Sequence, residues 1–181
     1  MKQDTTETIE THDTYGIAPV SAGKCAFVTL IEMDYTALAK ELTALLEGEY
    51  DLVANAANTA ALLYRNLPEI NWAGFYLLKG GELVLGPFQG KPACIRIAMG
   101  KGVCGTAAAK RETLMVDDVE LFPGHIACDA DSRSEMVVPL LRNNRLLGVL
   151  DLDSPRKGRF EECDARGCEM LMDIFLQHVM V

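Results

Sequence analysis

Apolar residues in the first third of the chain recur with the period of amphipathic helices. The leucines of residues 35–47 fall on one helix face, and they are Leu38, Leu42, Leu45 and Leu46. Gly48 follows them as a stop signal. A second apolar face runs over residues 51–66 and ends ahead of Pro68, because the residue before a proline disfavours helix. The pattern therefore predicts a helical hairpin.

The period then changes to that of strands. The segments NWAGFYLL and ELVLGPF flank a turn at Gly80 and Gly81, which predicts an antiparallel pair. A short strand is expected over residues 94–98. The stretch GKGVCGTAAAKRE favours a short helix, and TLMVDD after it a brief strand.

The second half of the chain contains a long polar loop and a second hairpin. The loop lies between Val116 and Glu135 and contains proline and glycine; loops of this length inside compact domains are often functional. Residues 135–141 and 145–151 predict two strands around Asn143 and Asn144, which tolerate the positive φ of such turns. From Phe160 onward a terminal helix is expected, with one buried face formed by Leu171, Ile174, Phe175 and Val179.

This order of elements predicts an α+β fold with a mostly antiparallel central sheet flanked by helices. The length of 181 residues suits one domain. We assign that domain to residues 31–181 and interpret residues 1–30, which are Thr-rich and acidic at their start, as a flexible extension.

Charge and composition exclude several classes of partner. The chain has 17 Lys and Arg against 26 Asp and Glu, a net charge of −9, which disfavours nucleic acid and anionic membranes as partners. No apolar run approaches the ~20 residues of a membrane span, and the first residues lack the pattern of an import peptide. We expect a cytoplasmic protein with reduced thiols.

The six cysteines fall into two groups. Cys25, Cys163 and Cys168 have apolar or helical surroundings, where cysteine is commonly a small buried hydrophobe. Cys94 and Cys104 taken singly also fit burial. Cys128 differs, since it lies in the polar loop near His125, Asp129 and Asp131 and has no apolar cluster to join. Its reactivity is therefore plausible.

Two chemistries fit the three central thiols and a histidine. One is a Cys3His zinc site, although Cys94 and Cys104 lack the short spacing of a zinc knuckle. The other is redox catalysis, in which one thiolate attacks an oxidised substrate and a second thiol resolves the product. We favour the redox reading.

Attack of a thiolate on an oxidised substrate also needs an acid and a binding pocket. Glu135, Asp151 and Asp153 are candidate acids at the ends of apolar strands, and the two aspartates share one face because strand side chains alternate. These aspartates could bind an ammonium group. Trp72 and Tyr76, four residues apart, also share a face and could form a pocket wall. Each residue alone also fits an ordinary structural role.

The segments LGPFQGKPACIRIAMGKGVCGTAA, DVELFPGHIACDADSRSEMVVPL and GVLDLDSP, together with NWAGFYLL, resemble the free methionine-R-sulfoxide reductases, a branch of the GAF fold. The resemblance runs from about Tyr35 to the C-terminus. It implies that the substrate is free methionine-R-sulfoxide, and that the protein needs no metal or other cofactor. Thioredoxin or a similar dithiol is the implied reductant.

The resemblance also implies roles for individual residues. Cys128 is the implied nucleophile and Cys94 the main resolving thiol, whereas Cys104 is either an alternative resolving thiol or a partner of Cys94. The implied substrate pocket is formed by Trp72, Tyr76, Glu135, Asp151 and Asp153, with Glu135 or Asp153 assisting proton delivery.

Two other functions stay open at this point. A GAF domain can be a sensor of small ligands without catalysis, because a fold alone does not determine a function. The zinc site is the other alternative. The oligomeric state is also open, with a homodimer among the expectations.

Overall fold

The helical hairpin begins at two aspartate caps. The structure is a computed structural model that describes residues 33–126 and 129–180. Helix α1 (Tyr35–Leu46) starts where the Asp34 carboxylate accepts a hydrogen bond from the Ala37 amide, and α2 (Leu52–Asn66) where Asp51 accepts from the amides of Val53 and Ala54. Such side chains satisfy amide groups that have no partner inside the helix.

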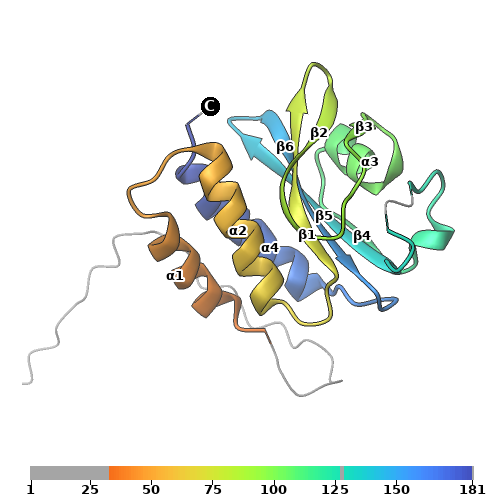
Figure 1. The fold of residues 1–181 in the computed structure, drawn as a ribbon, viewed down its shortest axis with the longest axis horizontal. Coiled ribbons are helices and arrows are strands. Elements are labelled where there is room, and N and C mark those ends of the chain that lie inside the picture. Colours follow the sequence, from red (N-terminus) through yellow and green to blue (C-terminus); the bar gives the residue numbers. More distant parts are fainter. Residues whose placement is uncertain (1–32, 127–128, 181) are drawn as a thin grey trace, which may run out of the picture.

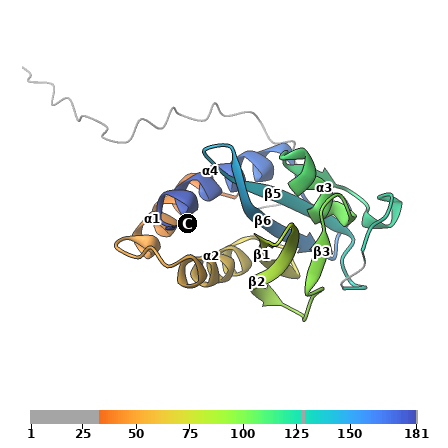
Figure 2. The ribbon, with the colours of Figure 1, turned by 90° about the horizontal axis from the view of Figure 1, so that it is seen from above.

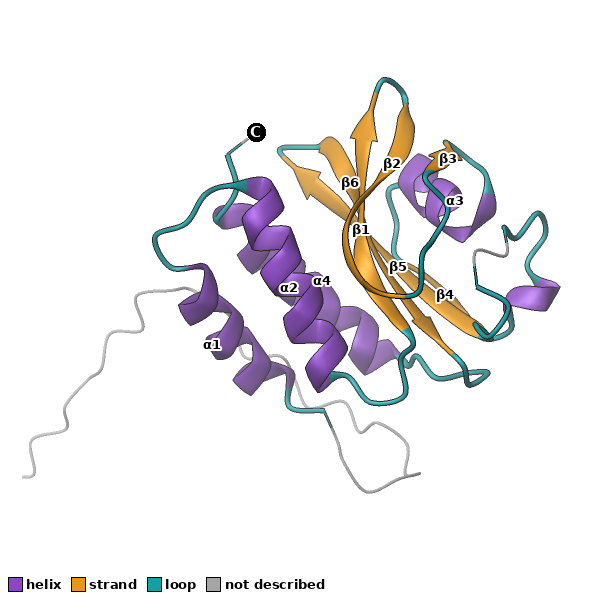
Figure 3. Cartoon of the chain, in the orientation of Figure 1, coloured by secondary structure: helices purple, strands orange, loops and turns teal. Residues whose placement is uncertain are grey.

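Six strands form one antiparallel sheet in the order β3-β2-β1-β6-β5-β4 (Figure 3). Two hairpins supply its centre: β1 (Trp72–Lys79) with β2 (Glu82–Gly90), and β5 (Ser134–Arg142) with β6 (Arg145–Ser154). The three-residue strands β3 (Arg96–Ala98) and β4 (Leu114–Val116) form the edges. Edges this short offer few unpaired backbone groups to another chain.

Helices cover the two faces of the sheet unequally (Figures 1 and 2). Helices α1, α2 and α4 (Glu162–Gln177) pack together on one face, and α3 (Gly102–Lys110) lies on the other with the loops around it, including the 3-10 turn η1 (Val119–Leu121). Two separate apolar cores result, one under the three long helices and one under α3.

Strand alternation assigns each residue to one of these cores. On β1, Ala73 and Phe75 point to the three-helix side, and Phe75 stacks on Phe175 of α4 with 5.0 Å between ring centroids. Trp72 and Tyr76 point to the α3 side. The α3 face of the sheet is therefore the one that receives the candidate pocket residues.

The structure confirms the predicted architecture and corrects some boundaries. The α+β fold and both hairpins are as expected, and Asn143 and Asn144 have φ values of 50° and 61°. The third strand begins at Arg96, so Cys94 precedes it, and α4 begins at Glu162 after Phe160. The predicted extension, residues 1–30, lies outside the described residues. No helix among the described residues is long and apolar enough to cross a membrane.

Candidate active site

A small pocket opens on the α3 side of the sheet. Among its lining residues are six of the candidates predicted from the sequence: Trp72, Tyr76, Cys104, Glu135, Asp151 and Asp153. They come from three strands and one helix that are far apart in the sequence. The fold therefore brings together most of the predicted site.

Strand register places the acidic residues side by side. Asp153 on β6 is paired directly with Trp72 on β1 and with Glu135 on β5. Asp151 is one step further along the same face of β6, opposite Gly74 and Val137. Side chains opposite one another on adjacent strands have Cβ atoms about 5 Å apart, so the three carboxyl groups share one small volume.

The aromatic residues form a stacked wall. The Trp72 ring lies 5.9 Å from Tyr76 and 5.3 Å from Phe88, centroid to centroid. Gly74 makes this possible, because a Cβ at that position would come within 2.6 Å of the Trp72 ring and 2.4 Å of the Phe88 Cβ. Trp72 and Tyr76 are 2% and 1% exposed, so the wall is rigidly packed.

The same two aromatic residues hold the loop that contains Cys94. The Trp72 indole donates to the Lys91 carbonyl at 3.1 Å, and the Tyr76 hydroxyl donates to the Cys94 carbonyl at 3.0 Å. Burial raises the pKa of Tyr76, and the nearby Asp151 carboxylate raises it further, which keeps the hydroxyl a donor. Trp72 and Tyr76 thus position this loop in addition to lining the pocket.

Burial changes the acidity of all three carboxyl groups. It raises the pKa of Asp151 to about 7. It also raises the pKa of Glu135 and of Asp153 well above their usual range, and in both cases the Asp151 charge raises it further. Burial therefore favours the protonated form of all three carboxyl groups relative to an exposed carboxyl group.

Cys104 lies next to this acidic cluster, in the first turn of α3. It is 2% exposed, and its Sγ is 3.7 Å from Glu135 Oε1. Burial, followed by the charges of Asp151 and Glu135, raises the pKa of this thiol well above its usual value. A protonated buried thiol is a poor nucleophile, so Cys104 is not suited to make the first attack.

Comparison with known proteins is consistent with this geometry. Residues 33–180 match the GAF domain family. The chain is 54% identical to free methionine-R-sulfoxide reductase of Escherichia coli over 138 residues, which are 76% of this chain and 84% of that protein. The yeast protein of the same name, from Saccharomyces cerevisiae, is 47% identical over 135 residues, 70% of this chain and 75% of its own length.

The chain belongs to the free methionine-R-sulfoxide reductase family of GAF domains.

A solved structure of this family shows the same fold. The structure of fRMsr of Staphylococcus aureus in complex with substrate superposes with a TM-score of 0.79 at 48% identity, and the match covers 83% of this chain and 99% of that one. The conclusion from the sequence motifs, that the chain is a member of this reductase family, is therefore confirmed.

The other two expected catalytic cysteines are Cys94 and Cys128. Cys94 is disulfide-bonded. Cys128, the expected nucleophile of the reductase family, lies outside the described residues. In its disulfide form Cys94 offers no thiolate to a metal, which counts against the Cys3His zinc site as long as that bond persists.

Two residues beside Cys128 in the sequence, His125 and Asp129, also line the pocket, a role that the sequence did not predict. His125 lines the pocket with its Nε2 3.8 Å from Glu135 Oε2, and burial lowers its pKa, which favours the neutral ring. Asp129 also lines the pocket. Its carboxylate accepts a hydrogen bond from the Asn71 side chain at 3.3 Å and forms an ion pair with Lys91 at 3.2 Å. Such contacts join residues 38 to 58 positions apart, so no local pattern predicts them.

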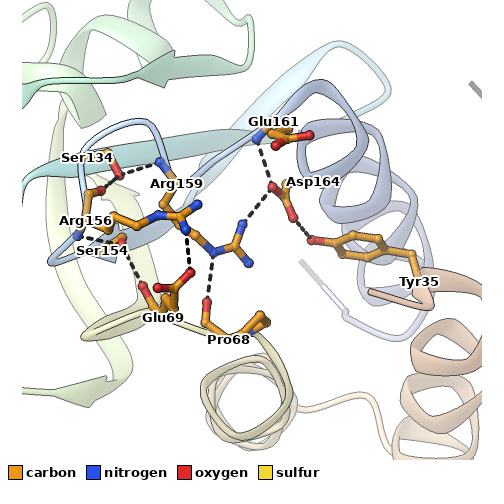
Figure 4. Close-up of polar contacts among 9 residues, drawn as sticks. All are labelled: Tyr35, Pro68, Glu69, Ser134, Ser154, Arg156, Arg159, Glu161 and Asp164. Carbon is orange, nitrogen blue, oxygen red and sulfur yellow. Dashed lines mark hydrogen bonds and ion pairs between the residues drawn. The ribbon is translucent and has the colours of Figure 1, made fainter. Parts of the chain in front are cut away.

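A buried polar network fixes the strand ends next to the pocket (Figure 4). Ser134, just before Glu135, donates to the Arg156 carbonyl at 2.7 Å, and Ser154, just after Asp153, donates to the Glu69 carbonyl at 2.6 Å. Arg159 ion-pairs with Asp164 at 2.9 Å in the same network. The carboxyl groups of the site are thus placed by strands whose ends are held by hydrogen bonds.

Proposed function

We propose that this chain reduces free methionine-R-sulfoxide to methionine, using Cys128 as nucleophile and Cys94 as resolving thiol. The observation that supports this most directly is the acidic cluster in the pocket. A sulfoxide sulfur becomes a good electrophile when its oxygen receives a proton, and a carboxylic acid that stays protonated near neutral pH can donate one.

The different acidities suggest different roles for the carboxyl groups. Asp151, whose pKa burial raises to about 7, is suited in its ionised form to bind the substrate ammonium group. Glu135 and Asp153, whose pKa values burial raises well above the usual range, are suited to deliver a proton to the sulfoxide oxygen. The wall of Trp72 and Tyr76 provides apolar surface for the methyl-sulfur group.

The proposed reaction proceeds in three steps. The Cys128 thiol attacks the sulfoxide sulfur and forms a bond to it while the substrate oxygen takes up a proton. That oxygen then passes to the Cys128 sulfur as the sulfur–sulfur bond and the original sulfur–oxygen bond break, so that methionine leaves and Cys128 becomes a sulfenic acid; the cysteine is oxidised by two electrons and the substrate is reduced by two. The Cys94 thiol then condenses with the sulfenic acid, which forms a disulfide and releases water. A dithiol reductant finally exchanges with this disulfide and restores both thiols.

The state of Cys94 supports its place in this sequence. It is disulfide-bonded, and its loop is held by hydrogen bonds from Trp72 and Tyr76, two residues of the pocket wall. Cys104 is buried beside Glu135 with a raised pKa, which fits a secondary role better than a first attack. These observations favour catalysis over ligand sensing, because a sensor does not require a redox-active cysteine beside its pocket.

The test is an assay with separated R and S diastereomers of free methionine sulfoxide and a dithiol donor. We expect turnover of the R form alone. Cys128→Ser should abolish methionine formation, and Cys94→Ser should give about one methionine per enzyme before stalling. Cys163→Ser, on α4 and away from the pocket, is the matched control and should turn over like the wild type. Equal multi-turnover activity of the Cys94 and Cys128 variants would refute the assignment.

We also propose thioredoxin or a similar dithiol as the physiological reductant and the cytoplasm as the compartment, because reduced thiols and a dithiol donor are both required for turnover. Comparison of thioredoxin with dithiothreitol as donor tests the first point. The oligomeric state is tested by sedimentation of the purified protein, which distinguishes a monomer from a homodimer.

A further inference from the structure

The pocket contains three metal-binding donor groups in close contact. One donor atom each from Cys104, Glu135 and Asp151 lies within 4.8 Å of the other two. Cys104 Sγ lies 3.7 Å from Glu135 Oε1. On a tetrahedral zinc ion a sulfur and an oxygen ligand are about 3.5 Å apart, so the group needs only a small contraction to bind one ion.

One carboxyl oxygen of Asp151 has no hydrogen-bond partner among the described residues. Asp151 is 7% exposed, it lines the pocket, and its Oδ1 has no hydrogen-bond partner among the described residues. An unpaired buried carboxylate oxygen is costly, and such an atom is usually satisfied by an ion, a water or a ligand. This oxygen is an observation separate from the clustering, and it points to a positively charged or donating ligand in the pocket.

The donor set indicates the class of ion. A thiolate together with two carboxylates and a nearby imidazole favours zinc and similar borderline divalent ions over magnesium or calcium, which prefer oxygen alone. His125 supplies the imidazole, since its Nε2 lies 3.8 Å from the second oxygen of Glu135. The pocket opening leaves a path by which an ion can enter.

We propose that the reduced protein binds one zinc-class divalent cation through Cys104, Glu135 and Asp151, with His125 as the nearest further donor. Binding forms one metal–sulfur bond and two metal–oxygen bonds as Cys104 and any protonated ligand carboxyl group release their protons to solvent, and no electrons are transferred. The ion occupies the pocket that we propose for the substrate, so cation and substrate exclude one another. The cation is thus a reversible inhibitor and gives Cys104 a role besides disulfide exchange.

Cobalt(II) is a suitable probe, because a thiolate bound to cobalt gives an intense near-ultraviolet charge-transfer band. We expect the fully reduced wild-type protein, freed of reductant, to develop this band with one equivalent of cobalt. Cys104→Ser should remove the band. Cys163→Ser and Cys94→Ser should retain it, since neither sulfur belongs to the proposed set.

The carboxylate ligands are tested in the same titration. Asp151→Asn should keep a band but weaken cobalt binding about 10-fold or more, since even indirect partners of metal ligands commonly contribute that much. A band that persists in Cys104→Ser, a band lost in Cys94→Ser, or unchanged affinity in Asp151→Asn would each overturn the proposal.

The cobalt band is independent of turnover, so its result is separable from the proposed reductase function. Added free methionine-R-sulfoxide should displace cobalt and lower the band, as expected for a shared pocket. Cobalt bound through Cys104 that the sulfoxide does not displace would overturn the mutual exclusion and leave the turnover assay to decide the catalytic assignment. Turnover with no cobalt band would overturn the metal site alone.

Discussion

Replacement of Arg159 by methionine isolates the contribution of the buried ion pair behind the active site (Figure 4). Arg159 is 7% exposed and donates to Asp164 Oδ2 and to the Pro68 carbonyl, both at 2.9 Å. Asp164 is 4% exposed and also accepts from the Tyr35 hydroxyl at 2.7 Å and the Glu161 amide at 2.8 Å. The pair thus joins α1, the α2–β1 connection and the start of α4.

Arg159→Met keeps most of the volume and removes the charge, which leaves the Asp164 carboxylate buried without its cation. Loss of one partner of a buried pair destabilises proteins by about 3–5 kcal/mol. For a chain of this size each kcal/mol lowers the melting temperature by about 2–4 °C. The expected decrease is therefore about 6–20 °C. Two remaining donors to Asp164 make the lower part of this range the better expectation.

Urea unfolding followed by circular dichroism measures the loss of unfolding free energy, and thermal unfolding followed by the same signal measures the decrease in melting temperature. Arg156→Met is the matched control, because its ion pair with Glu69 is also 2.9 Å long but joins side chains that are 46% and 52% exposed. Exposed pairs contribute about 0.2–1 kcal/mol. Arg159→Met combined with Asp164→Asn should recover part of the loss by removing the unpaired charge. Equal, small losses in both single variants would refute the reasoning.

Four further predictions concern the pocket and the sheet that carries it. Because the pKa of Asp151 in the folded protein is about 7, we expect binding of a cationic substrate to strengthen as the pH rises through about 7 and to weaken below it. The measurement is KM against pH, and Asp151→Asn should remove the dependence. The same pKa exceeds the ordinary value of 3.8, so this group lowers folding stability as the pH rises from about 4 to 7, visible in urea midpoints. Gly148→Ala should destabilise the protein by about 1–3 kcal/mol or more, because the added Cβ would lie 2.2 Å from the Tyr76 carbonyl oxygen; unchanged urea midpoints would contradict this. Lys91→Gln removes the ion pair with Asp129. We expect disulfide formation after one turnover to slow severalfold at most, and the rate of disulfide formation to lose its dependence on salt concentration. Thiol titration measures this rate.

The sequence alone determined the kind of each main element and the face on which its side chains lie. Helical and strand periods are set by covalent geometry, so Trp72 with Tyr76, and Asp151 with Asp153, could be assigned to common faces without a structure. The turn at Asn143 and Asn144 followed from the same local chemistry. Family motifs then indicated which of these faces is the functional one.

Tertiary structure alone decided which of these residues meet. Strand register puts Glu135 opposite Asp153, and packing under α3 buries both, which is what raises their pKa values. The contact of Cys104 with Glu135 and the Arg159–Asp164 pair join elements whose relative placement no local pattern contains. The physical reason is that acidity and pairing depend on desolvation and on neighbours across the sheet, and both exist only once the chain has folded.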